Sequence, residues 1–170
     1  MIILLKILLI EDNPADVRLI KELLNKSSIS PFEIITCTRL SEGLDYIKKK
    51  NIDVILLDLT LPDSDRELTL SAILNHTSRH PIIILTGFDD KEIALNSLNI
   101  GIQDYLVKGE LNETILARSI LYAIERHKIK IQNNLNIVDQ YSLDIKDKMI
   151  LNILQENYKI SFNTFELHLN

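Results

Sequence analysis

Five side chains that can do chemistry follow short apolar runs of the chain. They are Glu11, Asp12, Asp58, Thr86 and Lys108. Carboxylates that lie close together repel one another, and a hard cation such as Mg²⁺, which prefers oxygen ligands and often binds beside a phosphate, relieves that repulsion. An ionised aspartate can accept a phosphoryl group, whose charge a lysine ammonium and a threonine hydroxyl can balance. These residue types therefore predict Mg²⁺-assisted phosphoryl transfer, with Asp58 as the acceptor.

The elements that must position these side chains alternate along residues 1–127. The apolar runs occupy residues 4–10, 32–37, 53–58, 81–86 and 103–108. Four of the five are too evenly apolar for a sheet with one face in water, so we expect parallel strands that are covered on both sides. Helical patterns lie between them. This alternation predicts a doubly wound α/β domain with a five-stranded parallel sheet and helices on both faces.

Capping residues indicate where some of these helices begin. Asn13 followed by Pro14 combines an N-cap residue with proline at the first helical position. Ser64 and Glu67 have the spacing of a capping box, so we expect the helix after the apolar run at residues 53–58 to begin at Ser64. The last helix of the domain ends near His127, whose side chain we expect to be solvated.

The polar residues fall where the predicted strands end. The carboxyl ends of parallel strands share one edge of the sheet, and open α/β sheets bind their ligands there. With a strand order of 2-1-3-4-5, the first and third strands are neighbours. Glu11, Asp12 and Asp58 then converge, with Thr86 and Lys108 just beyond them.

Composition excludes several classes of protein. The chain is 46% hydrophobic and 25% charged, which is typical of globular rather than disordered or fibrous proteins. A net charge of −5 leaves no basic face for nucleic acid. No stretch approaches the ~20 apolar residues of a membrane span, and the apolar N-terminus lacks the basic flank of a signal peptide. A lone cysteine, Cys37, fits a buried thiol in the reducing cytoplasm.

Residues 128–170 do not continue the alternation. A partly helical extension is expected there, with an amphipathic pattern at Ile145, Met149, Ile150, Ile153 and Leu154. About 43 residues are too few to build a second core easily. The segment could extend the last helix, pack on a partner, or begin a further module, and a homodimer formed through its apolar residues is one of these alternatives.

Four segments, LLIEDNPADVRLI, DVILLDLTLPDSD, PIIILTGFDD and GIQDYLVKGE, resemble the response-regulator receiver family of two-component signalling. The resemblance covers about residues 5–127 and implies the flavodoxin-like strand order 2-1-3-4-5. It makes Asp58 the phospho-acceptor and Asp12 a direct Mg²⁺ ligand. Glu11 would act largely through a metal-bound water, and the backbone carbonyl of Thr60 would be the remaining protein ligand.

The resemblance also implies a switch and its partners. Thr86 and Lys108 would contact the phosphoryl group, and Tyr105 stands at the usual aromatic switch position. A histidine kinase or a phosphotransfer protein would donate the phosphoryl group. The surface of helix four, strand five and helix five would then change, and a downstream protein that the sequence does not identify would bind it.

Two positions depart from the family pattern. Gly109 follows Lys108 where the family often has proline, so we expect no cis peptide bond there. Arg66 follows Asp65 where related sequences usually have glycine, which puts the conformation of this loop in question. The KGEL and AIER segments resemble receivers that are attached to sensor or histidine-kinase modules rather than to DNA-binding domains.

Two other functions remain open at this point. A receiver-like module could bind a protein partner without phosphotransfer. A Mg²⁺-dependent aspartyl phosphatase of the haloacid-dehalogenase type would need a second aspartate two residues after Asp58, where this chain has Thr60, and a cap domain. We therefore expect a signalling protein that promotes only its own phosphoryl transfer and dephosphorylation, rather than an enzyme.

Overall fold

The computed structural model describes residues 4–27, 29, 31–49, 51–87 and 101–158, and the side chains of these residues up to 135. Residues 88–100, where helix four of the predicted switch surface would lie, are outside the described residues. The described part falls into two compact units, Met1–Lys128 and Ile129–Asn170, with the last residues of the second unit again not described.

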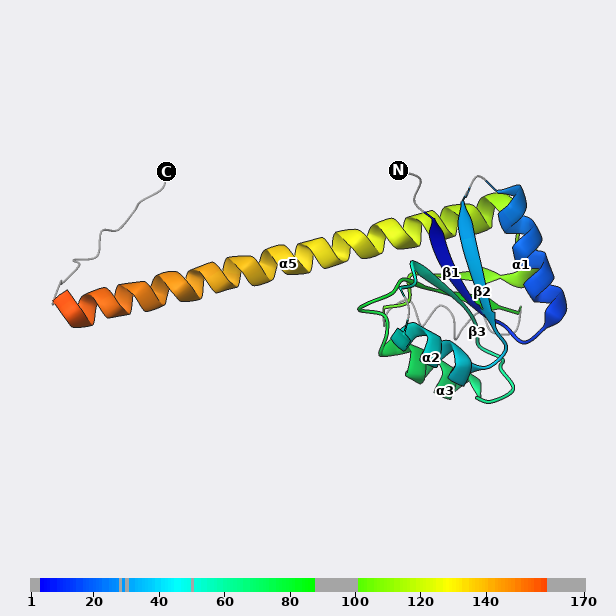
Figure 1. Ribbon diagram of the computed structural model, residues 1–170, viewed down its shortest axis with the longest axis horizontal. Helices are drawn as coiled ribbons and strands as arrows, with labels where there is room; N and C mark the ends of the chain where they lie inside the picture. The colour runs from blue at the N-terminus through cyan, green and yellow to red at the C-terminus, as the bar shows by residue number, and fades with distance from the viewer. Residues whose placement is uncertain (1–3, 28, 30, 50, 88–100, 159–170) are drawn as a thin grey trace. The chain divides into compact units, whose positions relative to one another are not determined.

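A parallel five-stranded sheet forms the centre of the first unit (Figure 1). Its strands are β1 (Leu5–Ile10), β2 (Phe32–Cys37), β3 (Val54–Asp58), β4 (Ile82–Thr86) and β5 (Asp104–Val107). They pair in the order β2-β1-β3-β4-β5, every pair parallel. Every residue of β3 and β4 is buried. The predicted doubly wound α/β fold is therefore confirmed.

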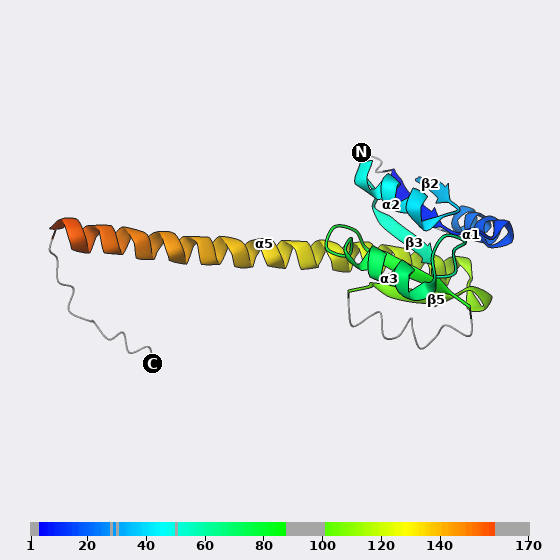
Figure 2. The same cartoon turned by 90° about the horizontal axis from the view of Figure 1, so that it is seen from below.

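Helices cover both faces of the sheet (Figures 1 and 2). The helices are α1 (Pro14–Lys26), α2 (Leu40–Lys49), α3 (Arg66–Leu74) and α5 (Glu113–Tyr158), with a short 3-10 helix, η2 (Lys108–Glu110), after β5. Because side chains alternate along a strand, Ile7 and Leu9 of β1 pack with α1 and the start of α5. Leu8 and Ile10 pack with α2 and α3 on the other face.

The predicted N-cap of α1 agrees with the structure, and the predicted N-cap of α3 does not. Asn13 caps α1, and its side chain accepts a hydrogen bond from Ala15 N at 3.0 Å, as predicted. The prediction that Ser64 caps α3 is wrong. Asp65 is the cap and accepts from Leu68 N at 2.9 Å, because Ser64 is held in a bridge with Leu61 in the preceding loop.

The last helix continues past the receiver-like core. α5 extends to Tyr158. The expectation that the last helix ends near His127 is therefore wrong, and the described part of the extension is helical. His127 is only 5% exposed, which corrects the expectation of a solvated side chain, because this turn of α5 still belongs to the first unit. Within the described residues, no helix combines the length and the hydropathy needed to cross a membrane.

Candidate functional site

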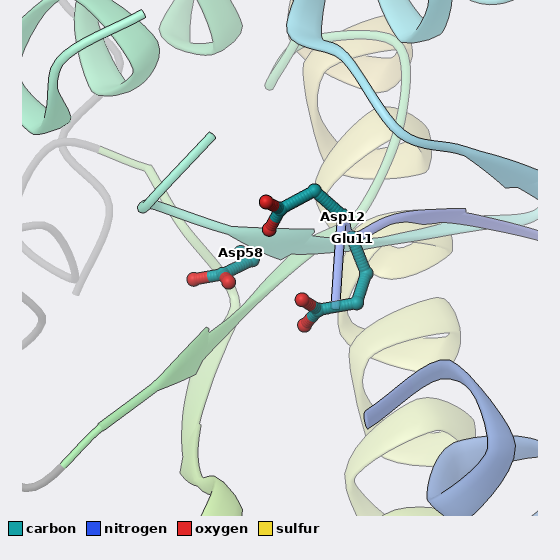
Figure 3. Close-up of side chains that lie close together, drawn as sticks. All are labelled: Glu11, Asp12 and Asp58. Atoms are coloured by element: carbon teal, nitrogen blue, oxygen red, sulfur yellow. The ribbon is translucent and has the colours of Figure 1, made fainter. Parts of the chain in front are cut away.

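Three carboxylates gather where β1 and β3 end (Figure 3). β1 and β3 are hydrogen-bonded neighbours, with Ile10 opposite Leu57, so the residues that follow them meet at the sheet edge. Glu11, Asp12 and Asp58 each place an oxygen within 4.8 Å of the others. Glu11 and Asp58 are buried, whereas Asp12 is exposed. We call these three residues the acidic trio.

Backbone groups fix two members of the trio. The Thr60 amide donates to Asp58 Oδ1 at 3.1 Å, and the Asn13 amide donates to Glu11 Oε1 at 3.0 Å. The Glu11 backbone amide itself continues the β1–β2 ladder by donating to Cys37 O at 2.9 Å. These local turns hold both carboxylates before any ligand binds, which lowers the cost of ordering them.

The Lys108 ammonium lies among carboxylates from three different segments. Its Nζ atom is 2.7 Å from Glu11 Oε2, 2.8 Å from Asp58 Oδ2 and 2.9 Å from Asp16 Oδ2. The ammonium donates hydrogen bonds to Asp58 and Asp16, and Glu11 is its third carboxylate contact, as an ion pair. Lys108 follows β5 directly, and the sheet therefore brings it to the edge where β1 and β3 end.

Burial and charge shift the pKa values of this group. Burial raises the pKa of Glu11 to about 7, and the Asp58 charge adds to this rise, whereas the hydrogen bond with Lys108 opposes it. Burial alone would lower the pKa of Lys108, but its hydrogen bonds with Asp58, Glu11 and Asp16 raise it above its ordinary value. Lys108 therefore stays protonated at neutral pH, whereas both the protonated and the ionised form of Glu11 are populated near pH 7.

The donor set of this site fits a hard divalent cation. All members of the acidic trio offer carboxylate oxygens, which Mg²⁺ prefers. Lys108 supplies a single positive charge to the trio and to Asp16, so the fully ionised cluster retains a net negative charge. A cation would relieve the repulsion that contributes to the raised pKa of Glu11.

Thr86 and Tyr105 lie on the two strands beyond the trio. Asp58 is paired with Leu85, so Thr86 stands one residue past Asp58 on the neighbouring strand. Its side chain is buried and donates to Gly87 O at 2.8 Å. Tyr105 is half-buried on β5 and lines a hollow of about 310 Å³ together with Glu110 and Ile115.

Sequence reasoning missed one residue of the site. Asp16, in the first turn of α1, reaches Lys108 across 92 positions of sequence. The available signal was its position in the first turn of the predicted helix, three residues after the N-cap residue Asn13. That spacing alone did not distinguish Asp16 from an ordinary acidic residue at a helix N-terminus.

Comparison with known proteins identifies the family. The model of the response regulator receiver domain matches residues 7–119. The chain belongs to this family. The cell cycle response regulator CtrA of Brucella ovis and that of Brucella anthropi are each 34% identical over 122 residues, which is 72% of this chain and 50% of the relative. The chain thus spans about half the length of the curated relatives it matches.

Solved receiver structures share the fold. A response regulator receiver domain protein from Clostridium thermocellum is 31% identical, with a TM-score of 0.64, and covers 74% of this chain and 98% of its own. A CheY-like receiver domain protein from Methanospirillum hungatei JF-1 is 25% identical, with a TM-score of 0.62, and covers 75% of this chain and 99% of its own. A sensor protein from Polaromonas is 24% identical, with a TM-score of 0.62, and supports the fold alone.

Proposed function

We propose that this receiver accepts a phosphoryl group on Asp58, with Mg²⁺, in histidine–aspartate signal transduction in the cytoplasm. The observation that carries the proposal is the Lys108 ammonium at 2.8 Å from Asp58 Oδ2 within the acidic trio. A buried carboxylate beside a fixed cation and a metal-ligand set has the parts needed for phosphoryl transfer.

The donor is a phosphohistidine of a histidine kinase or phosphotransfer protein, or a small phosphodonor. With a phosphohistidine donor, the P–N bond breaks, a bond forms between phosphorus and an Asp58 carboxylate oxygen, and the leaving imidazole takes up a proton. With acetyl phosphate, the P–O bond to the acetyl group breaks instead and acetate leaves. Asp12 and Asp58 would hold Mg²⁺ with the Thr60 carbonyl, and Glu11 through a water. The bound ion would supply positive charge to the group in transfer.

Thr86 and Tyr105 support a switch that follows phosphorylation. The Thr86 hydroxyl now donates to Gly87 O at 2.8 Å, and it would turn to a phosphoryl oxygen of Asp58. Space vacated by Thr86 would let the Tyr105 ring move further inward. The change shifts the population between two packings of the β5–α5 surface, which a downstream protein partner would bind.

Beryllofluoride, which mimics a phosphoryl group on an aspartate, tests the proposal directly. We expect Mg²⁺ with beryllofluoride to shift the amide resonances around Asp58, Thr86 and Lys108 in the wild type, and to leave those of Asp58→Ala unchanged. Asp45→Ala is the matched control, because Asp45 is an exposed aspartate that contacts Lys48. A wild type without any response would favour a module that binds partners without phosphotransfer, and turnover of a phosphate ester would favour a phosphatase.

A further inference from the structure

We propose that Asp16 is a positioning residue that holds the Lys108 ammonium beside Asp58. It does so while the carboxylates of the acidic trio exchange their contacts with Lys108 for contacts with a cation or a phosphoryl group. The inference rests on the proposed phosphorylation of Asp58. It concerns a residue on α1, outside the trio, that acts on the reaction only through Lys108.

The contact between Asp16 and Lys108 is short and sheltered. Asp16 Oδ2 accepts from Lys108 Nζ at 2.9 Å, and the two side chains are 25% and 18% exposed. The pair between Asp45 and Lys48 is longer, 3.4 Å, and both side chains are 64% exposed. Exposed pairs contribute little because water screens them, whereas a sheltered charge-assisted hydrogen bond is stronger. Asp16 therefore restrains Lys108 far more than an ordinary surface pair would.

The other two partners of Lys108 have competing roles. Glu11 and Asp58 both belong to the acidic trio, so a cation competes with Lys108 for their oxygens. An Asp58 oxygen also becomes bonded to phosphorus during transfer. Asp16 has neither role, and its carboxylate stays available to the ammonium before and after the reaction.

This arrangement explains how one N–H of Lys108 can become free without loss of its position. A lysine side chain is long and has many rotamers. Once the contact with Asp58 Oδ2 is released, the N–H that donated to it can turn to a phosphoryl oxygen. Asp16 keeps the side chain directed at the site, so the ammonium does not have to be ordered again for each transfer.

The contact between Asp16 and Lys108 can be tested without a metal ion or a phosphoryl donor. Lysine ammonium groups that are held by hydrogen bonds give slowly exchanging signals in ¹⁵N-edited spectra selective for Nζ. We expect such a signal for Lys108 in the metal-free wild type, assigned with Lys108→Arg, and we expect Asp16→Asn to broaden or shift it. Asp45→Asn, the matched control, should leave it unchanged. A Lys108 signal identical in the wild type and Asp16→Asn would overturn the inference.

A double-mutant cycle tests whether Asp16 acts through Lys108. With acetyl phosphate and Mg²⁺, the rate of phosphorylation should fall about tenfold in Asp16→Asn, the size expected for the loss of a sheltered charge-assisted hydrogen bond. In a Lys108→Ala background the same change should alter the rate less than about twofold. Equal factors in both backgrounds would contradict a role through Lys108.

Failure of this inference differs from failure of the proposed function. A wild type that is phosphorylated while Asp16→Asn matches it in rate and spectrum overturns the role of Asp16 alone. A wild type that accepts no phosphoryl group overturns the proposed function together with the kinetic role of Asp16. In that case the metal-free spectrum alone tests whether Asp16 holds the Lys108 ammonium.

Discussion

At the scale of single residues, Glu11 links the site to pH. Burial raises its pKa to about 7 from 4.5, so below pH 7 most molecules carry a protonated Glu11 when no metal is bound. A cation needs the ionised form. We therefore expect Mg²⁺ affinity to rise with pH up to about 7 and to level off above it. Calorimetry at pH 6 in two buffers of different ionisation enthalpy should show release of a proton on binding.

Glu11→Gln provides the control for this pH dependence. The amide cannot titrate, so the proton release and the rise in affinity between about pH 5 and 7 should both disappear, although the affinity itself is expected to be weaker. Burial also lowers the pKa of His76, and a His76→Gln variant excludes this histidine as the source of the proton. A wild type that binds Mg²⁺ at pH 6 without releasing a proton would contradict the assignment to Glu11.

The residue types at the strand ends predicted most of the site. They could not predict which further residue a long side chain would contact across the edge of the sheet. Glu11, Asp12, Asp58 and Lys108 come together as expected because β strands end at a common edge. Asp16 was missed because its partner is fixed by the direction of one long side chain, which no local pattern encodes. Metal binding and the roles of all the site residues in phosphoryl transfer and switching remain predictions.

At the scale of elements, Asp63 ties the loop after β3 to the start of α2. Its carboxylate accepts from the amides of Leu40 and Ser41, at 2.9 and 3.1 Å, and from the Ser41 hydroxyl at 2.9 Å. Burial alone would raise the pKa of Asp63, but these hydrogen bonds lower it overall. Asp63 thus supplies, from another segment, the cap that the first amides of α2 need.

We expect Asp63→Ala to lower the free energy of unfolding by about 1 kcal/mol, the usual cost of a lost N-cap. Urea unfolding at pH 7 measures the change. Asp45→Ala removes an exposed aspartate within α2 that contacts Lys48, and its effect should be within about 0.5 kcal/mol of zero. Equal effects of the two substitutions would show that the contact across the loop contributes nothing.

The close approach of α2 to β1 depends on Gly43. A Cβ at this position would overlap the Ile10 side chain, which is fully buried and packed between the sheet and α2. Alanine favours a helix over glycine by about 1 kcal/mol, but overpacking a core costs about 1–3 kcal/mol. We therefore expect Gly43→Ala to destabilise the protein by up to about 2 kcal/mol in urea unfolding.

Gly87 provides the comparison for this substitution. A Cβ there would meet nothing within 4 Å, so Gly87→Ala should leave the free energy of unfolding nearly unchanged. If Gly43→Ala proves as stable as the wild type, Ile10 must be able to change rotamer without cost. The sequence alone predicted both elements because of their apolar spacing, but it could not predict how closely they pack, since that depends on the tilt of α2 against the strand.

At the scale of the whole molecule, the match to the receiver family covers most of the first unit and none of the second. The receiver match ends at residue 119, whereas α5 continues to Tyr158. The apolar spacing of residues 128–170 predicted helix there, but it could not decide between an extended last helix and a separate one. That choice depends on whether the turn around His127 stays helical, as it does here.

The part of α5 beyond the first unit presents apolar side chains to solvent. Ile129, Ile131 and Leu135 are 57%, 40% and 58% exposed. Ile131 and Leu135 are four residues apart on one side of the helix, and in the sequence the apolar residues Ile145, Met149 and Ile153 follow with the same spacing. Helical stability in proteins comes mostly from the packing of such a face. A second copy of this chain offers the same face, and two helices of this kind can bury it against each other.

We therefore expect the full chain to be a dimer of two 19.6 kDa subunits when its mass is measured by light scattering at micromolar concentration. The double substitution Ile131→Glu and Leu135→Glu changes two residues that share one helix face, and it should give the mass of a single chain. Gln132→Glu adds charge one residue from Ile131, on another side of the helix, and should remain dimeric. A wild type with the mass of a single chain would contradict self-association, and another protein would then have to cover this face.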